Sequence, residues 1–141
     1  MLVRLMYVSH AAKPLDQEEL HAILAQARAN NPQHGVSGVL LTAGELFVQV
    51  LEGGREAISR LYNRIVADPR HTDVTLLRFE EIRERRFAGW AMGQVPVSRV
   101  NPALLMKYSE SATLNPYAMP GYATAALFDE LVATASVMCQ S

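Results

Sequence analysis

Residues 36–51, VSGVLLTAGELFVQVL, contain two apolar runs with a short break between them. The runs extend from Val36 to Thr42 and from Glu45 to Leu51, and Thr42-Ala43-Gly44 joins them. Two apolar runs separated by a tight connection that carries glycine are typical of a β-hairpin. We therefore expect two antiparallel strands here.

A helix is predicted before this hairpin. Asp16 is a suitable N-cap, and Glu19 follows three residues later as its capping-box partner. Asn31-Pro32 ends the helix, because the residue before proline disfavours helical geometry. A helix from about Asp16 to Asn30, with an apolar strand from Leu2 to Ser9 before it, fits the apolar residues at helical spacing, Leu20, Ile23, Leu24 and Ala27.

The segments after the hairpin are predicted to form a second helix and two further strands. Gly53-Gly54 is expected to break the second strand, and a second amphipathic helix then ends near Asp68-Pro69. Val74 to Phe79 and Ala91 to Val97 are predicted as two further strands. The order βαββαββ predicts a ferredoxin-like α/β sandwich, with two helices on one face of a mixed sheet.

The composition changes after Pro96. Asn101-Pro102 is expected to begin a short helix, and an Ala-rich helix is expected from about Tyr122 to Met138. A sheet with helices on one face needs a cover on the other. We therefore expect residues 1–97 to form the principal domain. Residues 98–141 should be a helical extension that covers the sheet within the same compact unit.

Composition and charge exclude several classes of function. Half of the 141 residues are apolar and the formal net charge is −1, which disfavours nucleic acid as a partner. No apolar run is long enough to span a bilayer, so no membrane association is expected. A single cysteine, Cys139, fits a cytoplasmic protein. No metal site is expected, because the histidines lack ligand spacing: His10, His21, His34 and His71.

Two polar side chains lie on strand faces that should be buried. Tyr7 shares its face with Leu5, and Gln49 lies between Phe47 and Leu51, since side chains alternate with period two. A buried polar group without a partner costs about 1–3 kcal/mol, so each needs a hydrogen bond. Each has an ordinary explanation alone: a tyrosine bonded to a backbone carbonyl, and a glutamine at a sheet edge.

Two more polar residues extend the apolar stripes of the helices. Asn31 falls four residues after Ala27, and Asp68 falls three after Ile65. By default these residues simply end a helix and form a turn before proline. Taken with Tyr7, they could instead line a cleft between the two helices.

Such a cleft would suit a planar ligand with hydrogen-bonding groups on its edge. A carboxamide carries both donor and acceptor functions, so Asn31 and Gln49 could each match a donor–acceptor pair. Ile23 and Ile65, one on each helix, could enclose its flat faces. The argument from residue types alone identifies a planar polar ligand and no more.

Over roughly residues 2 to 97 the sequence resembles the BLUF family of flavin-binding blue-light sensors. Several separate blocks match in the right order, which is more specific than a single short motif. The blocks are LMYVSHA, ILAQARANNPQHGVSGVLL, GELFVQVLEGGREAISRLYNRI, DPRH and RRFAGWAMG.

The resemblance implies a role for each matching position around the flavin. Tyr7 would be the redox-active tyrosine, and Gln49 the switching glutamine between the tyrosine hydroxyl and the flavin N5/O4 edge. The ring's polar edge would be met by Asn30 and Asn31. The O2 side, the ribityl chain and the phosphate would lie near Arg64, Asp68, Arg70 and His71. Trp90 and Met92 would exchange proximity to the glutamine during signalling.

The resemblance further implies a photoreceptor rather than a turnover enzyme. Light would drive electron and then proton transfer from Tyr7 through Gln49, leaving the glutamine in a new hydrogen-bonding arrangement. The signal would pass through the fifth strand and the C-terminal helices to an unidentified downstream protein. The expected cofactor is FAD, with FMN or riboflavin as alternatives. The apolar tail suggests a homodimer, although the same helix could simply cover the sheet.

Two other functions compete with this interpretation. The first is an acylphosphatase-like hydrolase that uses Arg28 and Asn31 to hold a phosphate. Against it, no glycine-rich phosphate cradle precedes the first helix, where the sequence is Ser9-His10-Ala11-Ala12-Lys13-Pro14. The second is an interaction module that binds no ligand and uses its Ala-rich helix.

Overall fold

The computed structural model describes residues 1–133, and it has the predicted βαββαββ order followed by two helices. Three short 3₁₀ turns connect these elements, at Pro32–His34, Val97–Arg99 and Pro116–Ala118. The predicted helix end at Met138, and Cys139, lie outside the described residues. The strands and helices are β1 (Leu2–Ala11), α1 (Gln17–Asn30), β2 (Ser37–Ala43), β3 (Leu46–Gly54), α2 (Arg55–Ala67), β4 (His71–Ile82), β5 (Gly93–Pro96), α3 (Pro102–Tyr108) and α4 (Gly121–Ala133).

The five strands form one sheet in the order β4-β1-β3-β2-β5. The pairs β4–β1, β1–β3 and β3–β2 are antiparallel, and β5 lies parallel to β2 at the edge. The central register places Tyr7 opposite Gln49 and Leu5 opposite Leu51. The ferredoxin-like fold is therefore confirmed, with the fifth strand added beside the predicted hairpin.

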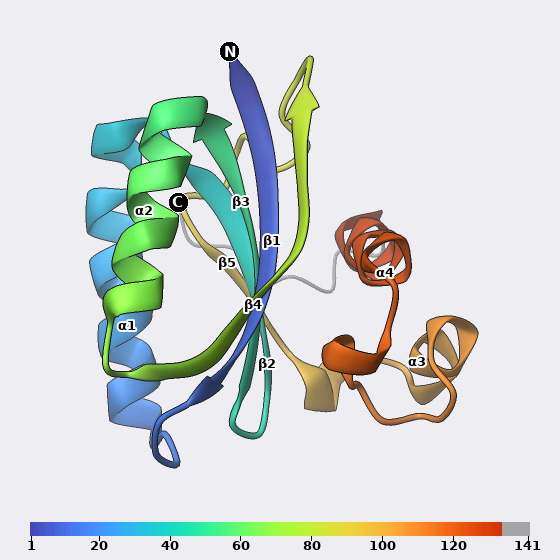
Figure 1. The fold of residues 1–141 in the computed structure, drawn as a ribbon. Helices are drawn as coiled ribbons and strands as arrows, with labels where there is room; N and C mark the ends of the chain where they lie inside the picture. Colours follow the sequence, from blue (N-terminus) through green and yellow to red (C-terminus); the bar gives the residue numbers. More distant parts are fainter. Residues whose placement is uncertain (134–141) are drawn as a thin grey trace.

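The helices form a layer on each side of the sheet (Figure 1). Helices α1 and α2 pack on one face, and their core includes Val3, Leu24 and Ile58. Helices α3 and α4 lie on the other face, where Leu127 and Phe128 of α4 are fully buried. The expectation that the C-terminal helices cover the second face is confirmed. Within residues 1–133, no helix has the length and apolar character needed to cross a membrane.

The predicted helix starts are also found. The Asp16 side chain accepts a hydrogen bond from the Glu19 backbone N–H at 2.7 Å, and Asn101 caps α3 through the Ala103 N–H at 2.9 Å. The Glu19 side chain does not complete a capping box, since it pairs with Lys13 at 3.5 Å.

Several strand ends differ from the prediction. β3 ends at Gly54, so the glycine pair terminates it as expected, although both glycines still pair with the start of β1. β4 extends from His71 to Ile82 and is longer than the predicted Val74 to Phe79. The fifth strand begins at Gly93 instead of Ala91. The carbonyls of Ala91 and Met92 are bound by side chains of the first helical region, so these residues are held to α1 and not to a strand partner.

Candidate functional site

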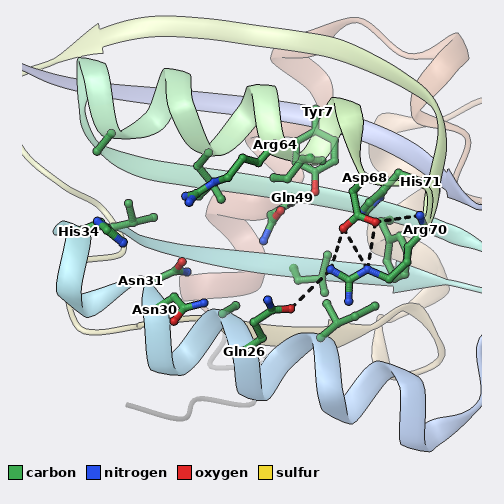
Figure 2. Close-up of a pocket in the computed structure, with 18 residues that line it drawn as sticks. Tyr7, Gln26, Asn30, Asn31, His34, Gln49, Arg64, Asp68, Arg70 and His71 are labelled. Atoms are coloured by element: carbon green, nitrogen blue, oxygen red, sulfur yellow. Dashed lines mark hydrogen bonds and ion pairs between the residues drawn. The ribbon is translucent and has the colours of Figure 1, made fainter.

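A pocket of about 330 Å³ lies between α1, α2 and the sheet (Figure 2). Its volume is at the lower end of the range typical of small-molecule sites, about 300–1,000 Å³. All ten residues predicted to contact a ligand line it: Tyr7, Ile23, Asn30, Asn31, Gln49, Arg64, Ile65, Asp68, Arg70 and His71. Side chains from four separate segments of the chain therefore converge on one cavity. The residue pattern predicted a cleft between the two helices, and the family resemblance implied Asn30, Arg64, Arg70 and His71.

Tyr7 and Gln49 form a direct hydrogen bond at the floor of this pocket. Their strands place them side by side, and the Tyr7 hydroxyl donates to Gln49 Oε1 at 2.5 Å. Tyr7 is 1% exposed and Gln49 is 9% exposed. Burial, with smaller contributions from the Tyr62 phenol and the Asp68 carboxylate, holds the pKa of Tyr7 well above its usual range. The phenol therefore stays protonated and donates its hydrogen to the glutamine.

The other end of the Gln49 carboxamide contacts Met92. Gln49 Nε2 donates to Met92 Sδ at 3.3 Å, and Met92 is buried in the core beneath α1 and α2. Trp90 lies on the other side of the sheet, where its ring stacks on Phe87 at a centroid distance of 6.2 Å. The structure thus brings Met92 to the glutamine and keeps Trp90 away from it. Neither residue lines the pocket.

Asn31 links the pocket to the segment before β5. It follows the last turn of α1, is 5% exposed, and donates from Nδ2 to the Ala91 carbonyl at 2.8 Å. A carboxamide has two N–H donors and one acceptor oxygen, so one donor and the oxygen remain for a ligand. Asn30 is exposed and lies at the rim of the same pocket.

A charged cluster stands at the opposite end of the pocket. Asp68 accepts hydrogen bonds from the backbone and side chain of Arg70, with an ion-pair distance of 2.7 Å. These bonds hold the pKa of Asp68 below its usual value. Arg70 Nη2 also reaches Gln26 Oε1 of α1 at 3.5 Å, so the guanidinium spans the space between the two helices.

His71 and Arg64 complete the polar lining. His71 Nδ1 lies 2.8 Å from Ser9 Oγ, and burial lowers the pKa of the imidazole, which favours its neutral form. Arg64 extends from α2 into the pocket (Figure 2), and within residues 1–133 it forms no ion pair. Its positive charge is therefore available to an oxygen of a ligand.

Several residues of the site were not predicted from the sequence. Gln26, His34, Leu40, Phe47, Ala57 and Leu61 also line the pocket. Helical spacing could have found Gln26, which lies three residues after Ile23, and period two could have found Phe47 beside Gln49. Helical spacing could also have found Tyr62, which falls four residues after Ile58 and whose ring lies 5.9 Å from that of Tyr7.

The buried carboxylate of Glu52 was also missed. It lies on the opposite face of β3 from Gln49, is fully buried, and pairs with Arg4 at 2.7 Å. It also accepts the backbone N–H groups of Arg86 and Phe87. Glu52 thereby fastens the start of the loop that carries Trp90 and Met92 to the sheet.

The donor set fits the planar ligand expected from the sequence. Ile23 of α1 and Ile65 of α2 supply apolar surfaces to the pocket, and Asn31 supplies polar groups to the same pocket. Isoalloxazine has the same division, with flat apolar faces and an edge of donors and acceptors. The described residues also contain no group of three His, Cys, Asp or Glu side chains placed to hold a metal ion.

The same geometry disfavours a phosphate-binding hydrolase. Arg28 does not line the pocket, and its Nε donates to the Met92 carbonyl at 3.1 Å. One Asn31 amide hydrogen is bound to Ala91. Arg28 thus lies outside the pocket, and the arginine–asparagine pair that would hold a phosphate is not assembled there.

Comparison with known proteins identifies a family of flavin-dependent sensors, which agrees with a pocket for a planar ligand. A sequence model of the BLUF family, described as sensors of blue light using FAD, matches residues 2–93. Photoactivated adenylate cyclase subunit beta of Euglena gracilis is 44% identical over 84 residues, which are 60% of this chain and 10% of that subunit. The chain therefore spans about a tenth of the length of this relative.

Two solved structures match nearly the whole chain. The ground state of BlsA is 32% identical with a TM-score of 0.82, covering 94% of this chain and 88% of BlsA. The dark state of the BLUF protein BlrB is 30% identical with a TM-score of 0.80, covering 95% of this chain and 96% of BlrB.

Proposed function

The chain belongs to the BLUF family of blue-light sensors that use flavin, and we propose that the pocket between α1 and α2 is its flavin site. The observation that carries this proposal is the buried contact series from Tyr7 through Gln49 to Met92. It places a phenol and a carboxamide at the floor of a pocket shaped for a planar ring. Tyr7, Gln49 and Asn31 would surround the polar edge of that ring.

When bound, the flavin supplies the absorption of blue light and accepts an electron from the protein. Tyr7 would be the electron donor, and its hydroxyl proton would leave through Gln49, the only group to which the phenol is hydrogen-bonded within residues 1–133. Once Tyr7 has regained its electron and proton, the Gln49 carboxamide would be left rotated or tautomerised. The two arrangements of Gln49 differ in which hydrogen bonds they make, and this difference is the stored signal.

The remaining lining residues would bind the flavin without taking part in the switch. Ile23 and Ile65 would pack on the two faces of the ring, with Asn30 near its pyrimidine end. Arg64 would meet an oxygen of the ring. The ribityl chain would extend toward the charged end of the pocket, which is formed by Asp68, Arg70 and His71.

FAD is the flavin we expect. The pocket volume of about 330 Å³ suits the ring and the start of the ribityl chain, so the rest of a dinucleotide would lie outside it. FMN and riboflavin have the same ring and ribityl chain, so they remain alternatives. Measuring the affinity of the protein for each flavin would distinguish them. Arg70, at the mouth, would favour flavins that carry phosphate.

The signal would leave through the loop before β5 and reach the C-terminal helices. In this proposal residues 1–97 form the sensing part, and residues 98–141 form the extension that carries output to a partner protein or a second copy of the chain. Arg86 of the loop pairs with Asp129 of α4, which supplies a physical link. Hydrogen exchange over residues 90–133, compared in light and darkness, would differ; identical exchange would reject this route.

The experiment that tests the flavin site is direct. The purified chain should be yellow and should shift its absorption reversibly to the red under blue light. A colourless folded protein that takes up no flavin would favour an interaction module. The sensor is proposed to act without catalysing a reaction of its own, so any effector activity would belong to a partner.

A further inference from the structure

The three residues before β5 are fastened through successive backbone carbonyls. The Trp90 carbonyl accepts from the Gly38 N–H at 3.0 Å, and the Ala91 carbonyl accepts from Asn31 Nδ2 at 2.8 Å. The Met92 carbonyl accepts from Arg28 Nε at 3.1 Å. β2 therefore holds the first of these residues, and the end of α1 holds the next two.

These three hydrogen bonds determine which side chain, that of Trp90 or that of Met92, faces Gln49. Met92 and Trp90 are two residues apart, yet Met92 enters the core beside Gln49 and Trp90 packs against Phe87 on the other face of the sheet. The hydrogen bond from Gln49 Nε2 to the Met92 sulfur, at 3.3 Å, is weak because a thioether is a poor acceptor. A guanidinium bond to a carbonyl is charge-assisted and stronger, so the backbone contact governs where Met92 lies.

Arg28 differs from the other groups that hold this segment. Asn31 lines the pocket and would touch the flavin, so its substitution would change the site itself. Arg28 is half-buried and lies outside the pocket. Its hydrogen bond to the Met92 carbonyl connects it to the glutamine, because the Met92 sulfur accepts from Gln49.

We propose that Arg28 is a positioning residue of the switch: by holding the Met92 carbonyl, it keeps the Met92 sulfur against Gln49 and Trp90 on the opposite face. This inference rests on the proposed flavin site for its link to light. Its structural part concerns only Arg28, Met92 and Trp90. That part can be measured in protein without flavin.

The test uses Trp90, the only tryptophan of the chain, as an intrinsic probe. Arg28→Met keeps the apolar stem and removes the donor. In flavin-free protein it should change the Trp90 emission maximum and its quenching by acrylamide. Arg60→Met removes an exposed arginine paired with Glu56 on α2, and this matched control should leave both signals unchanged.

A double-mutant cycle then ties the effect to Met92. With flavin bound, Arg28→Met should slow the dark recovery of the red-shifted state by about tenfold or more, the change expected when one charge-assisted hydrogen bond is lost. In a Met92→Leu background, which removes the sulfur contact, the same substitution should change recovery little. Effects of other Arg28 contacts occur equally in both backgrounds, so comparing the two backgrounds removes them.

Three outcomes separate the possibilities. The proposal is supported if Trp90 emission changes and the recovery effect depends on Met92. It is overturned if Arg28→Met behaves as the wild type, or if its recovery effect is equally large with Leu at position 92. Failure of the wild type to bind flavin would reject the proposed function, and the Trp90 signals would still decide the role of Arg28.

Discussion

The Tyr7 hydroxyl donates to Gln49 Oε1 at 2.5 Å, across two strands whose register makes these residues direct neighbours. The sheet therefore holds the two backbone positions side by side before any ligand binds, so the carboxamide can rotate while remaining next to the phenol. A one-residue slip of either strand would turn its member of the pair to the opposite face of the sheet and separate the two side chains. The pocket is built around this pair, and the predictions below depend on it.

Replacing Tyr7 with phenylalanine should stop productive photocycling while the protein still binds flavin. The substitution removes the hydroxyl and leaves the Gln49 oxygen without its donor, at a cost of about 1–3 kcal/mol in the free energy of unfolding. Light-minus-dark absorption and chemical denaturation measure the two effects. A normal red shift in this variant would exclude tyrosine as the electron donor.

The raised pKa of Tyr7 predicts how the protein behaves at alkaline pH. An ordinary phenol ionises near pH 10, so folding favours the protonated form of Tyr7. The resulting stability is present in full below pH 10 or so and is lost as the pH rises toward the folded-state pKa. Ultraviolet titration should show equal phenolate formation in folded wild type and Tyr7→Phe. An additional phenolate in the folded wild type would show that Tyr7 is exposed.

Arg70→Ala should weaken binding of FMN and FAD more than binding of riboflavin. The guanidinium is partly exposed at the pocket mouth, where a phosphate would gain about 0.5–1 kcal/mol, or about two- to fivefold in affinity. Titration of apoprotein with each flavin measures the difference, with Arg60→Ala as the control. Equal losses for all three flavins would show that Arg70 does not contact the phosphate.

Glu52→Gln should destabilise the fold by about 3 kcal/mol, as expected when one member of a buried ion pair is neutralised. Every polar neighbour of this carboxylate is a donor, so the amide N–H₂ of glutamine would face Arg4 or the loop N–H groups. Glu80→Gln, on the outer side of Arg4, should cost less than about 1 kcal/mol. Denaturant unfolding compares the two variants, and equal effects would contradict a special role for Glu52.

The sequence was most informative where periodicity and turn chemistry act locally. Asp16 marked the start of α1, and the alternation along β3 placed Gln49 inward among apolar neighbours. Polar residues at positions that should be apolar then indicated the pocket. That reasoning needs no long-range geometry. It predicted the fold and a cleft between the two helices, whereas the resemblance to the BLUF family implied the further lining residues Asn30, Arg64, Arg70 and His71.

The contacts that were missed depend on an irregular loop. The position of Glu52 on β3 gave no sign that the N–H groups of Arg86 and Phe87, more than thirty residues later, return to it. Likewise, the spacing of Trp90 and Met92 could not show which one faces Gln49. The path of that loop is set by backbone carbonyls and side-chain donors, which have no sequence period.

The light-minus-dark spectrum of Gln49→Leu, compared with wild type, tests the central claim most directly. Leucine fills a similar space at this position but can neither accept from Tyr7 nor donate to Met92. We predict that the variant binds flavin and shows no red shift under blue light, whereas the wild type shifts and recovers in darkness. A reversible red shift of normal size without the carboxamide would contradict the account.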